Sequence, residues 1–302
     1  MLSKILMASA KNSSSKALVS NTHWWYIIPG FLLIGLFSVI YYNYSSQFSF
    51  SKIVNGFTSE FFVFLIIGVF AQLVDGTLGM GYGATSTSFL LSFGVPPAIS
   101  STAVHVSEMF TTGASAISHH KFGNINRKLA KMLIIPGVIG SIIGAYLLSD
   151  VIDGNAIKPY IAIYMIILAI VIIVKAVRKK RPKKPTKQLG LLAIFGGFMD
   201  SVGGGGWGPI VTSTLIGRGR DPRYTIGSVN AAEFAISFAS GITFLLFQGI
   251  HGWQVIAGLI LGGVIAAPLG AYFINKIPRK PAMVAVGLMI IFLSLRTLVK
   301  WF

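Results

Sequence analysis

Four carboxylic acids in apolar stretches of this chain form two pairs with the same spacing. The 302 residues contain only eight Asp and Glu, and four of these lie in long apolar runs: Asp75, Glu108, Asp200 and Glu233. The two aspartates are 125 residues apart, and so are the two glutamates. An ionisable side chain at membrane depth is costly and usually marks a functional site. The spacing therefore predicts two similar halves with a site between them.

The composition is that of a polytopic membrane protein. Hydrophobic residues make up 54% of the chain and charged residues 11%, and the mean hydropathy is +0.75. Apolar runs at 24–44, 157–177, 253–275 and 283–301 reach the ~20 residues that a membrane-spanning helix needs. The net charge of +17 comes from Lys and Arg in short loops, so it indicates orientation in the membrane and not nucleic-acid binding. Because the chain has no Cys, disulfides and Cys-ligated metal centres are excluded.

The two halves align without a gap. Residues 75–83 (DGTLGMGYG) match 200–208 (DSVGGGGWG), and His105-x-x-Glu108 matches Asn230-x-x-Glu233. We expect an all-α protein with two inverted repeats and one extra N-terminal helix. Its parts are a disordered tail at 1–23, the extra transmembrane helix at 24–44, a first repeat at 58–177, a basic cytoplasmic linker at 178–187 and a second repeat at 188–302.

Each repeat is expected to open with a glycine-rich broken or re-entrant helix, followed by three transmembrane helices. The runs at 60–74 and 188–199, and those after the glycines at 85–93 and 209–217, are too short to span a bilayer. Two hairpins entering from opposite sides place 21 Lys and Arg in the inside loops and 4 outside, whereas two full crossings give 15 and 10. The positive-inside rule therefore favours the opposed hairpins.

The glycine-rich tips of the two hairpins, at residues 79–83 and 204–208, are the predicted anion-binding site. Glycine lets a backbone approach a ligand closely, and the N-termini of the half-helices that follow carry unpaired N–H groups. The predicted substrate-binding residues are Gly79, Gly81, Tyr82, Gly83, Thr85, Ser86, Thr87, Gly204, Gly206, Trp207, Gly208, Thr212 and Ser213. Close helix packing is the alternative role for the glycines. Tyr82 and Trp207 either pack on substrate or plug the tips.

The six polar residues Asp75, His105, Glu108, Asp200, Asn230 and Glu233 are predicted to have coupling or structural roles. Asp75 and Asp200, which directly precede the tips, are expected to cap the breaks more than to touch substrate. A buried Glu108 or Glu233 could carry a coupling proton, or could accept hydrogen bonds from the unwound tip. We expect no cofactor and no metal site, and H⁺ or Na⁺ as the coupling ion.

Together, the glycine tracts, the paired acids and the basic linker resemble the TauE/SafE sulfite-exporter family, also called the toluene sulfonate uptake permease family. The resemblance covers about residues 58–300. It implies a secondary transporter of small sulfur-containing anions or organosulfonates, such as sulfite or sulfoacetate, in the plasma membrane (the bacterial inner membrane). Members are usually drawn with about eight spans, which two hairpins do not reproduce.

The rival functions are an anion channel and an intramembrane enzyme. No HExxH metal motif or GxSxG nucleophile motif occurs, so the chain is not expected to be an enzyme. The expected partners are a small anionic organosulfur substrate and the lipid bilayer, with no nucleic acid. A second copy of the chain, forming a homodimer, is a further candidate partner on general grounds alone. Neither the identity of the anion nor the direction of transport follows from the sequence.

Overall fold

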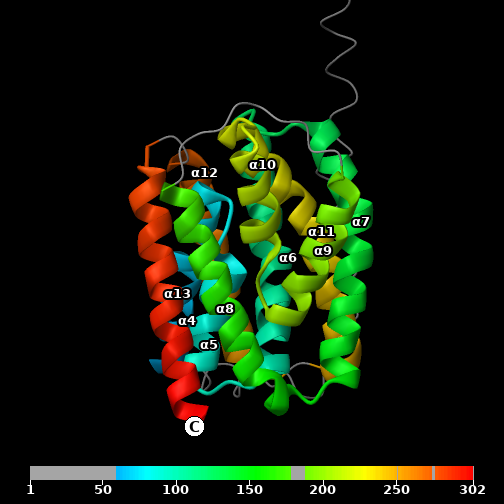
Figure 1. Ribbon diagram of the computed structural model, residues 1–302, viewed down its shortest axis with the longest axis vertical. Coiled ribbons are helices and arrows are strands. Elements are labelled where there is room, and N and C mark those ends of the chain that lie inside the picture. The colour runs from blue at the N-terminus through cyan, green and yellow to red at the C-terminus, as the bar shows by residue number, and fades with distance from the viewer. Residues whose placement is uncertain (1–58, 178–187, 250, 274–275, 302) are drawn as a thin grey trace, which may run out of the picture. The chain divides into compact units, whose positions relative to one another are not determined.

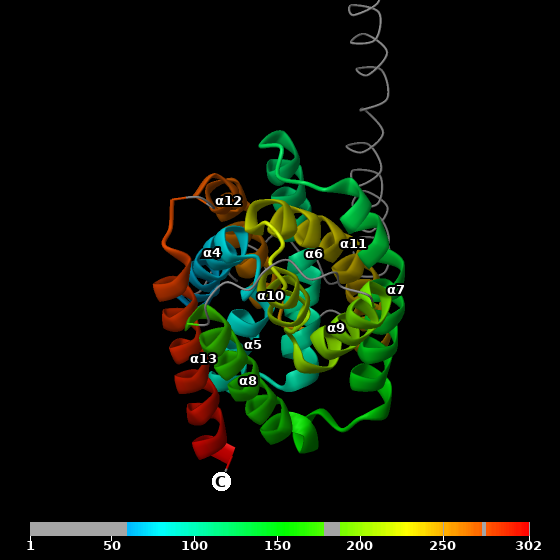
Figure 2. The same ribbon diagram turned by 45° about the horizontal axis from the view of Figure 1, so that its top comes forward.

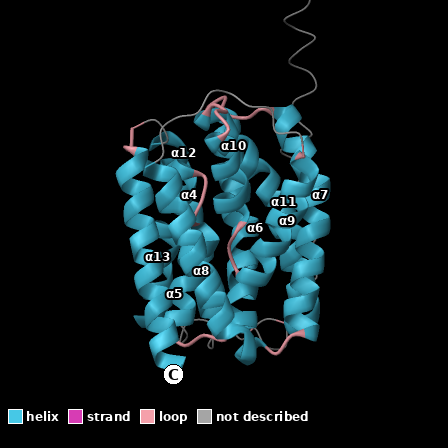
Figure 3. Ribbon diagram, viewed as in Figure 1, coloured by secondary structure: helices cyan, strands magenta, loops and turns pink. Residues whose placement is uncertain are grey.

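All the regular secondary structure in the part of the chain that the structure describes is helical. The computed structural model describes residues 59–177, 188–249, 251–273 and 276–301, which lie in one compact unit, Gly56–Phe302. Within these residues there is no strand (Figures 1 and 3). The elements are α4 (Ser59–Leu78), α5 (Tyr82–Ser92), α6 (Pro97–Lys121), α7 (Arg127–Tyr146), η1 (Leu147–Val151), α8 (Gly154–Val177), α9 (Leu189–Gly203), η2 (Gly208–Thr212), α10 (Ser213–Gly217), α11 (Pro222–Gln248), α12 (Trp253–Phe273) and α13 (Arg279–Trp301).

The all-α prediction is confirmed for these residues. The predicted tail at 1–23, the predicted extra helix at 24–44 and the predicted linker at 178–187 lie outside them.

The distribution of polar and apolar side chains is that of a membrane protein. Among the described residues, six helical segments are long and apolar enough to cross a bilayer: Phe61–Leu78, Arg127–Val151, Ala156–Val177, Pro222–Gln248, Trp253–Phe273 and Arg279–Trp301. Large apolar side chains face outward, among them Ile135 and Phe292, while most of the Ser and Thr of α6 are buried. An apolar exterior around a polar interior suits lipid as the surrounding solvent. The chain is therefore a multi-pass membrane protein.

Glycines in the left-handed region separate the short helices from the longer ones. Gly79 and Gly81 have φ of 67° and 121° between α4 and α5, and Gly204 has φ of 71° at the end of α9. Because other residues rarely adopt such angles, the helices end there. The predicted boundaries were partly wrong. Helix α4 continues four residues past position 74, because Gly79 and not the earlier Gly76 ends it, and α5 begins at Tyr82 instead of near residue 85.

The two broken elements open toward opposite ends of the bundle. In Figure 1, α4 and α5 are antiparallel and α5 ends at the lower end, beside the C-terminus, whereas α10 ends at the upper end. Hydrogen bonds agree: Lys300 Nζ donates to the Ser92 carbonyl at one end, and Arg223 donates to the Phe122 carbonyl at the other. This is the arrangement that two opposed hairpins would produce, although their placement in a membrane stays a prediction.

The short helices α5 and α10 occupy the middle of the bundle, and the helix before each break packs against a helix of the other half (Figure 2). Figure 2 shows α5 and α10 near the centre with the longer helices around them. Helix α12 packs along α4, and α7 packs along α9. Glycines bring these helices together: a Cβ on Gly76 would lie 2.8 Å from Gly270 Cα, and one on Gly197 would lie 2.3 Å from the Gly137 carbonyl oxygen. Because each of these contacts joins one half of the chain to the other, the packing holds the segments that carry Asp75 and Asp200 in the core.

Candidate functional site

Asp200 caps the second helix break. Its Oδ1 accepts hydrogen bonds from the backbone N–H groups of Gly206 at 2.7 Å and Trp207 at 2.8 Å. Its side chain is 2% exposed. A carboxylate that accepts two backbone N–H groups forms charge-assisted hydrogen bonds, which are stronger than neutral ones. The predicted capping role is therefore the role that the structure gives to Asp200.

Asp75 lies at the matching position before the first break and has a different main partner. The side-chain amide of Asn230, from α11, donates to Asp75 Oδ2 at 3.1 Å and to Ser115 Oγ at 3.0 Å. The backbone N–H of Tyr82 also donates to Asp75, as the N–H of Trp207 does to Asp200. Each aspartate thus holds its own tip and meets a side chain from the other half.

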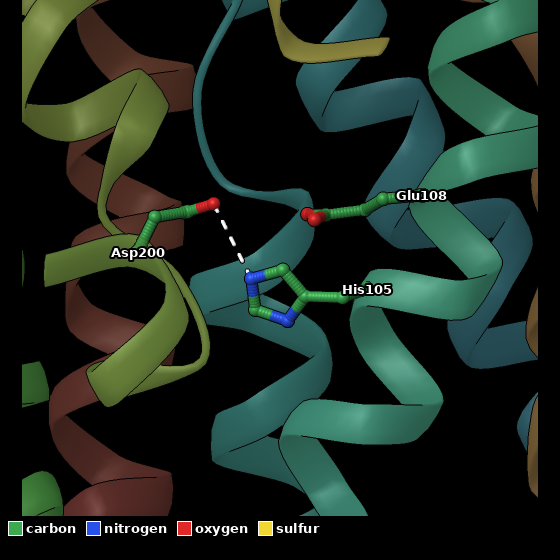
Figure 4. Close-up of side chains that lie close together, drawn as sticks. All are labelled: His105, Glu108 and Asp200. Atoms are coloured by element: carbon green, nitrogen blue, oxygen red, sulfur yellow. Dashed lines mark ion pairs between the residues drawn. The ribbon is translucent and has the colours of Figure 1, made fainter. Parts of the chain in front are cut away.

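His105, Glu108 and Asp200 converge in the core (Figure 4). His105 and Glu108 extend from α6, and Asp200 extends toward them from α9. His105 Nε2 lies 3.4 Å from Asp200 Oδ2, and one ligand atom from each of the three residues lies within 4.8 Å of the others. All three side chains are at most 2% exposed. The three side chains therefore form one buried polar cluster that joins α6 of the first half to α9 of the second.

The two glutamates lie mid-helix in the same core. Glu108 Oε2 accepts a hydrogen bond of 3.4 Å from Ser237 Oγ, and Glu108 Oε1 would lie 3.0 Å from a Cβ on Gly83. Glu233 is 4% exposed, and its Oε2 has no hydrogen-bond partner among the described residues. Glu108 therefore lies directly beside the first tip.

The two glycine tips are in contact with each other. A Cβ on Gly83 would lie 2.8 Å from Gly205 Cα, and one on Gly208 would lie 2.5 Å from Met80 Cα. The Thr87 hydroxyl donates to the Gly204 carbonyl across the contact. At these positions the glycines allow close packing, which was the alternative to direct ligand contact.

The hydroxyls near the tips fall into two groups. Thr87 donates to Gly204, while Ser213 donates to the Pro209 carbonyl and accepts from Lys175 Nζ. In contrast, the hydroxyls of Thr85, Ser86 and Thr212 are buried without a partner among the described residues. Unsatisfied buried polar groups are rare and call for an explanation. A bound polar ligand or water would satisfy them.

The aromatic residues of the tips are fully buried and point into helix contacts. Trp207 Nε1 donates to the Val229 carbonyl at 3.3 Å, and the Tyr82 hydroxyl donates to the Leu259 carbonyl at 3.3 Å. Trp207 also belongs to an apolar cluster that includes Leu133. These contacts are the ones expected of residues that plug the tips.

Several residues around the site were not singled out in the sequence. The Ser101 carbonyl oxygen lies 2.8 Å from His105 Nδ1, Ser115 binds Asn230, and Ser237 binds Glu108. The Tyr164 hydroxyl of α8 is buried beside Gly206. One signal was available for Ser237: it lies 125 residues after Thr112, so both halves carry a hydroxyl at this position. Tyr164 has no such counterpart.

A helical membrane protein with two broken helices that meet at a buried polar core has the architecture of a membrane transporter. Comparison with known proteins narrows this class. The family described as "Sulfite exporter TauE/SafE" matches residues 64–297, and the chain belongs to this family. It is 41% identical to the "Probable membrane transporter protein YtnM" of Bacillus subtilis (strain 168) over 248 residues, which is 79% of this chain and 82% of the relative. No solved structure matches it.

Proposed function

We propose that this chain is a secondary transporter of small sulfur-containing anions, such as sulfite or sulfoacetate, in the plasma membrane. Membership of the TauE/SafE family supports the transporter class, and the family's printed description suggests sulfite. The observation that carries the proposal is a cluster of buried hydroxyls without partners beside two helix breaks. Hydroxyl and backbone N–H donors suit a sulfite or sulfonate group.

The anion is proposed to bind beside the contact between the tips. The first turn of α5 supplies the backbone N–H group of Gly83, together with the Thr85 and Ser86 hydroxyls, which have no hydrogen-bond partner among the described residues. The N-terminus of a helix carries a partial positive charge, which favours an anion. Because the tips pack tightly on one another, the passage of substrate requires them to separate.

A negative substrate in this core needs a compensating positive charge. Asp75, Glu108 and Asp200 are buried at the tips. Two half-buried cations approach them: Lys175 donates to Ser213 Oγ, and Arg279 donates to the Leu78 carbonyl. The carboxyl groups therefore outnumber these cations. Buried like charges repel strongly in a medium of low dielectric constant. A proton or another cation is therefore expected to accompany the anion, which is a property of coupled transport and not of simple conduction.

A binding screen followed by a flux measurement tests the proposal. Purified protein is heated with sulfite, thiosulfate, sulfoacetate, sulfate or acetate, because a ligand that binds the native state raises the melting temperature. We expect sulfite or an organosulfonate to give the largest rise and acetate none. Radiolabelled sulfite should then exchange across vesicle membranes at a rate that saturates with concentration. Equal shifts for all five anions, or flux that does not saturate, would contradict the proposal.

A further inference from the structure

The imidazole of His105 is held so that one of its nitrogens is available for a proton. Its Nδ1 lies 2.8 Å from the Ser101 carbonyl oxygen, and a carbonyl can only accept. Nδ1 therefore carries a hydrogen in both the neutral and the charged ring. The remaining nitrogen, Nε2, is the atom that gains or loses a proton. The ring is completely buried and packs against Phe244, with 5.2 Å between the ring centroids.

Nε2 faces the one oxygen of Asp200 that is not used for capping. Oδ1 binds the tip N–H groups, while Oδ2 lies 3.4 Å from Nε2. Neither Nε2 nor Oδ2 has a hydrogen-bond partner among the described residues. In the neutral ring, two lone pairs face each other across this gap. A proton on Nε2 converts the same pair into a charge-assisted hydrogen bond.

Among the described residues, the other titratable groups of the core around this pair are acidic or phenolic. They are Asp75 of α4, Tyr82 of α5, Glu108 of α6, Tyr164 of α8 and Glu233 of α11. Uncompensated carboxylates in a membrane interior are strongly disfavoured. Of the side chains in this group, His105 is the only one that can become positively charged. The cluster is thus built to favour an added proton.

The second half of the chain has no titratable donor at the position that matches His105. The position that matches His105 is Asn230, whose amide donates permanently to Asp75 Oδ2. An amide does not titrate, so its hydrogen bond is made at every pH. The two halves therefore share one arrangement, a donor on a long helix that meets the aspartate of the other half. Only in the first half does that donor depend on a proton.

We propose that His105 Nε2 is the binding site of the coupling proton, shared with Asp200 Oδ2. This inference rests on the proposed transport function and names its coupling site. A proton from water on one side of the membrane binds Nε2 and forms the N–H···O bond to Asp200. It leaves from the same nitrogen to water on the other side. Because Asp200 also holds Gly206 and Trp207, protonation acts directly on the carboxylate that fixes the second tip.

The main test is the replacement His105→Asn, which gives the first half the residue that the second half already has. Protein in vesicles is assayed with radiolabelled sulfite in two ways: exchange at equal pH on both sides, and accumulation driven by a pH gradient. Relative to its own rate of exchange, the variant should lose gradient-driven accumulation and sulfite-dependent proton flux. The matched control is His119→Asn, which replaces the other fully buried histidine of α6 and should retain all three. Gradient-driven accumulation of sulfite by His105→Asn at the wild-type level would overturn the proposal.

A second measurement does not depend on the substrate. Protein with ¹⁵N-labelled histidine is measured by NMR over a series of pH values. The signal that His105→Asn removes should show Nδ1 protonated throughout and Nε2 changing with pH. An Nε2 signal that does not change would overturn the proton site, even if sulfite is transported. A metal ion found at one per chain in the wild type and absent from His105→Asn would also overturn it. Failure of sulfite exchange with a titrating Nε2 would instead count against the proposed substrate alone.

Discussion

Asn230 donates a hydrogen bond to Asp75 from the opposite half of the chain, over 3.1 Å between Nδ2 and Oδ2. The equivalent positions 125 residues away, His105 and Asp200, also face each other, at 3.4 Å. In each pair the aspartate precedes a helix break of one half, and its partner lies on the long helix, α6 or α11, of the other half. The two halves therefore complete each other's sites, and neither break has its full set of partners without the other half.

The capping role of Asp200 predicts a loss of stability when its carboxylate is removed. Asp200→Ala leaves the N–H groups of Gly206 and Trp207 without acceptors and should cost about 2–4 kcal/mol. Asp200→Asn retains an oxygen acceptor and should cost less. The melting temperatures of the purified proteins should therefore rise from Asp200→Ala to Asp200→Asn to the wild type. Equal melting temperatures for Asp200→Ala and the wild type would show that the cap does not stabilise the fold.

The contact between α7 and α9 predicts opposite effects for two glycines of the same helix. A Cβ on Gly197 would meet the Gly137 carbonyl oxygen at 2.3 Å, so Gly197→Ala should push the helices apart and cost about 1–3 kcal/mol. Gly190 has open space around it. Gly190→Ala should be neutral or should stabilise the helix by up to about 1 kcal/mol. Thermal unfolding of both variants tests this, and similar melting temperatures for the two would contradict the packing argument.

The sequence alone predicted the residues of the core but not their contacts. The shared spacing identified Asp75 and Asp200, and the three-residue interval to each glutamate placed His105 and Asn230 on the same helical faces as Glu108 and Glu233. Spacing shows which positions are equivalent. It does not show which ones touch, and the pairing of His105 with Asp200 depends on how the halves interlock.

The helix ends were less predictable for a related reason. Gly76 lies inside α4, because its missing side chain lets α12 approach at Gly270, whereas Gly79 adopts a left-handed conformation and ends the helix. Both are glycines in one short tract, and only the tertiary contact distinguishes them. Likewise, the sequence could not decide whether the tip glycines meet a ligand or each other, because both uses require the same missing Cβ.

The opposed hairpins predict that two sites label from opposite sides of the membrane. Phe93 follows α5 and Gly217 ends α10, and both positions are exposed. The chain has no native Cys, so Phe93→Cys and Gly217→Cys each introduce a single thiol. A membrane-impermeant thiol reagent should reach Phe93→Cys from outside the cell, and Gly217→Cys only from the cytoplasmic side. Labelling of both from the same side would contradict the opposed-hairpin topology.

The hydroxyls of α5 predict a separation between substrate binding and stability. The Thr85 hydroxyl has no partner among the described residues, whereas the Thr87 hydroxyl joins the two tips through the Gly204 carbonyl. Thr85→Val and Thr87→Val each replace one hydroxyl of α5 by a methyl group, which almost preserves the side-chain volume. Thr85→Val should weaken sulfite binding by about 0.5–1.5 kcal/mol and leave the melting temperature near that of the wild type. Thr87→Val should lower the melting temperature instead, because it leaves a buried carbonyl without its donor. Isothermal calorimetry and thermal unfolding of the two folded variants distinguish these outcomes. If Thr85→Val binds sulfite with wild-type affinity, the anion does not contact the first turn of α5, and its site must be sought elsewhere in the core.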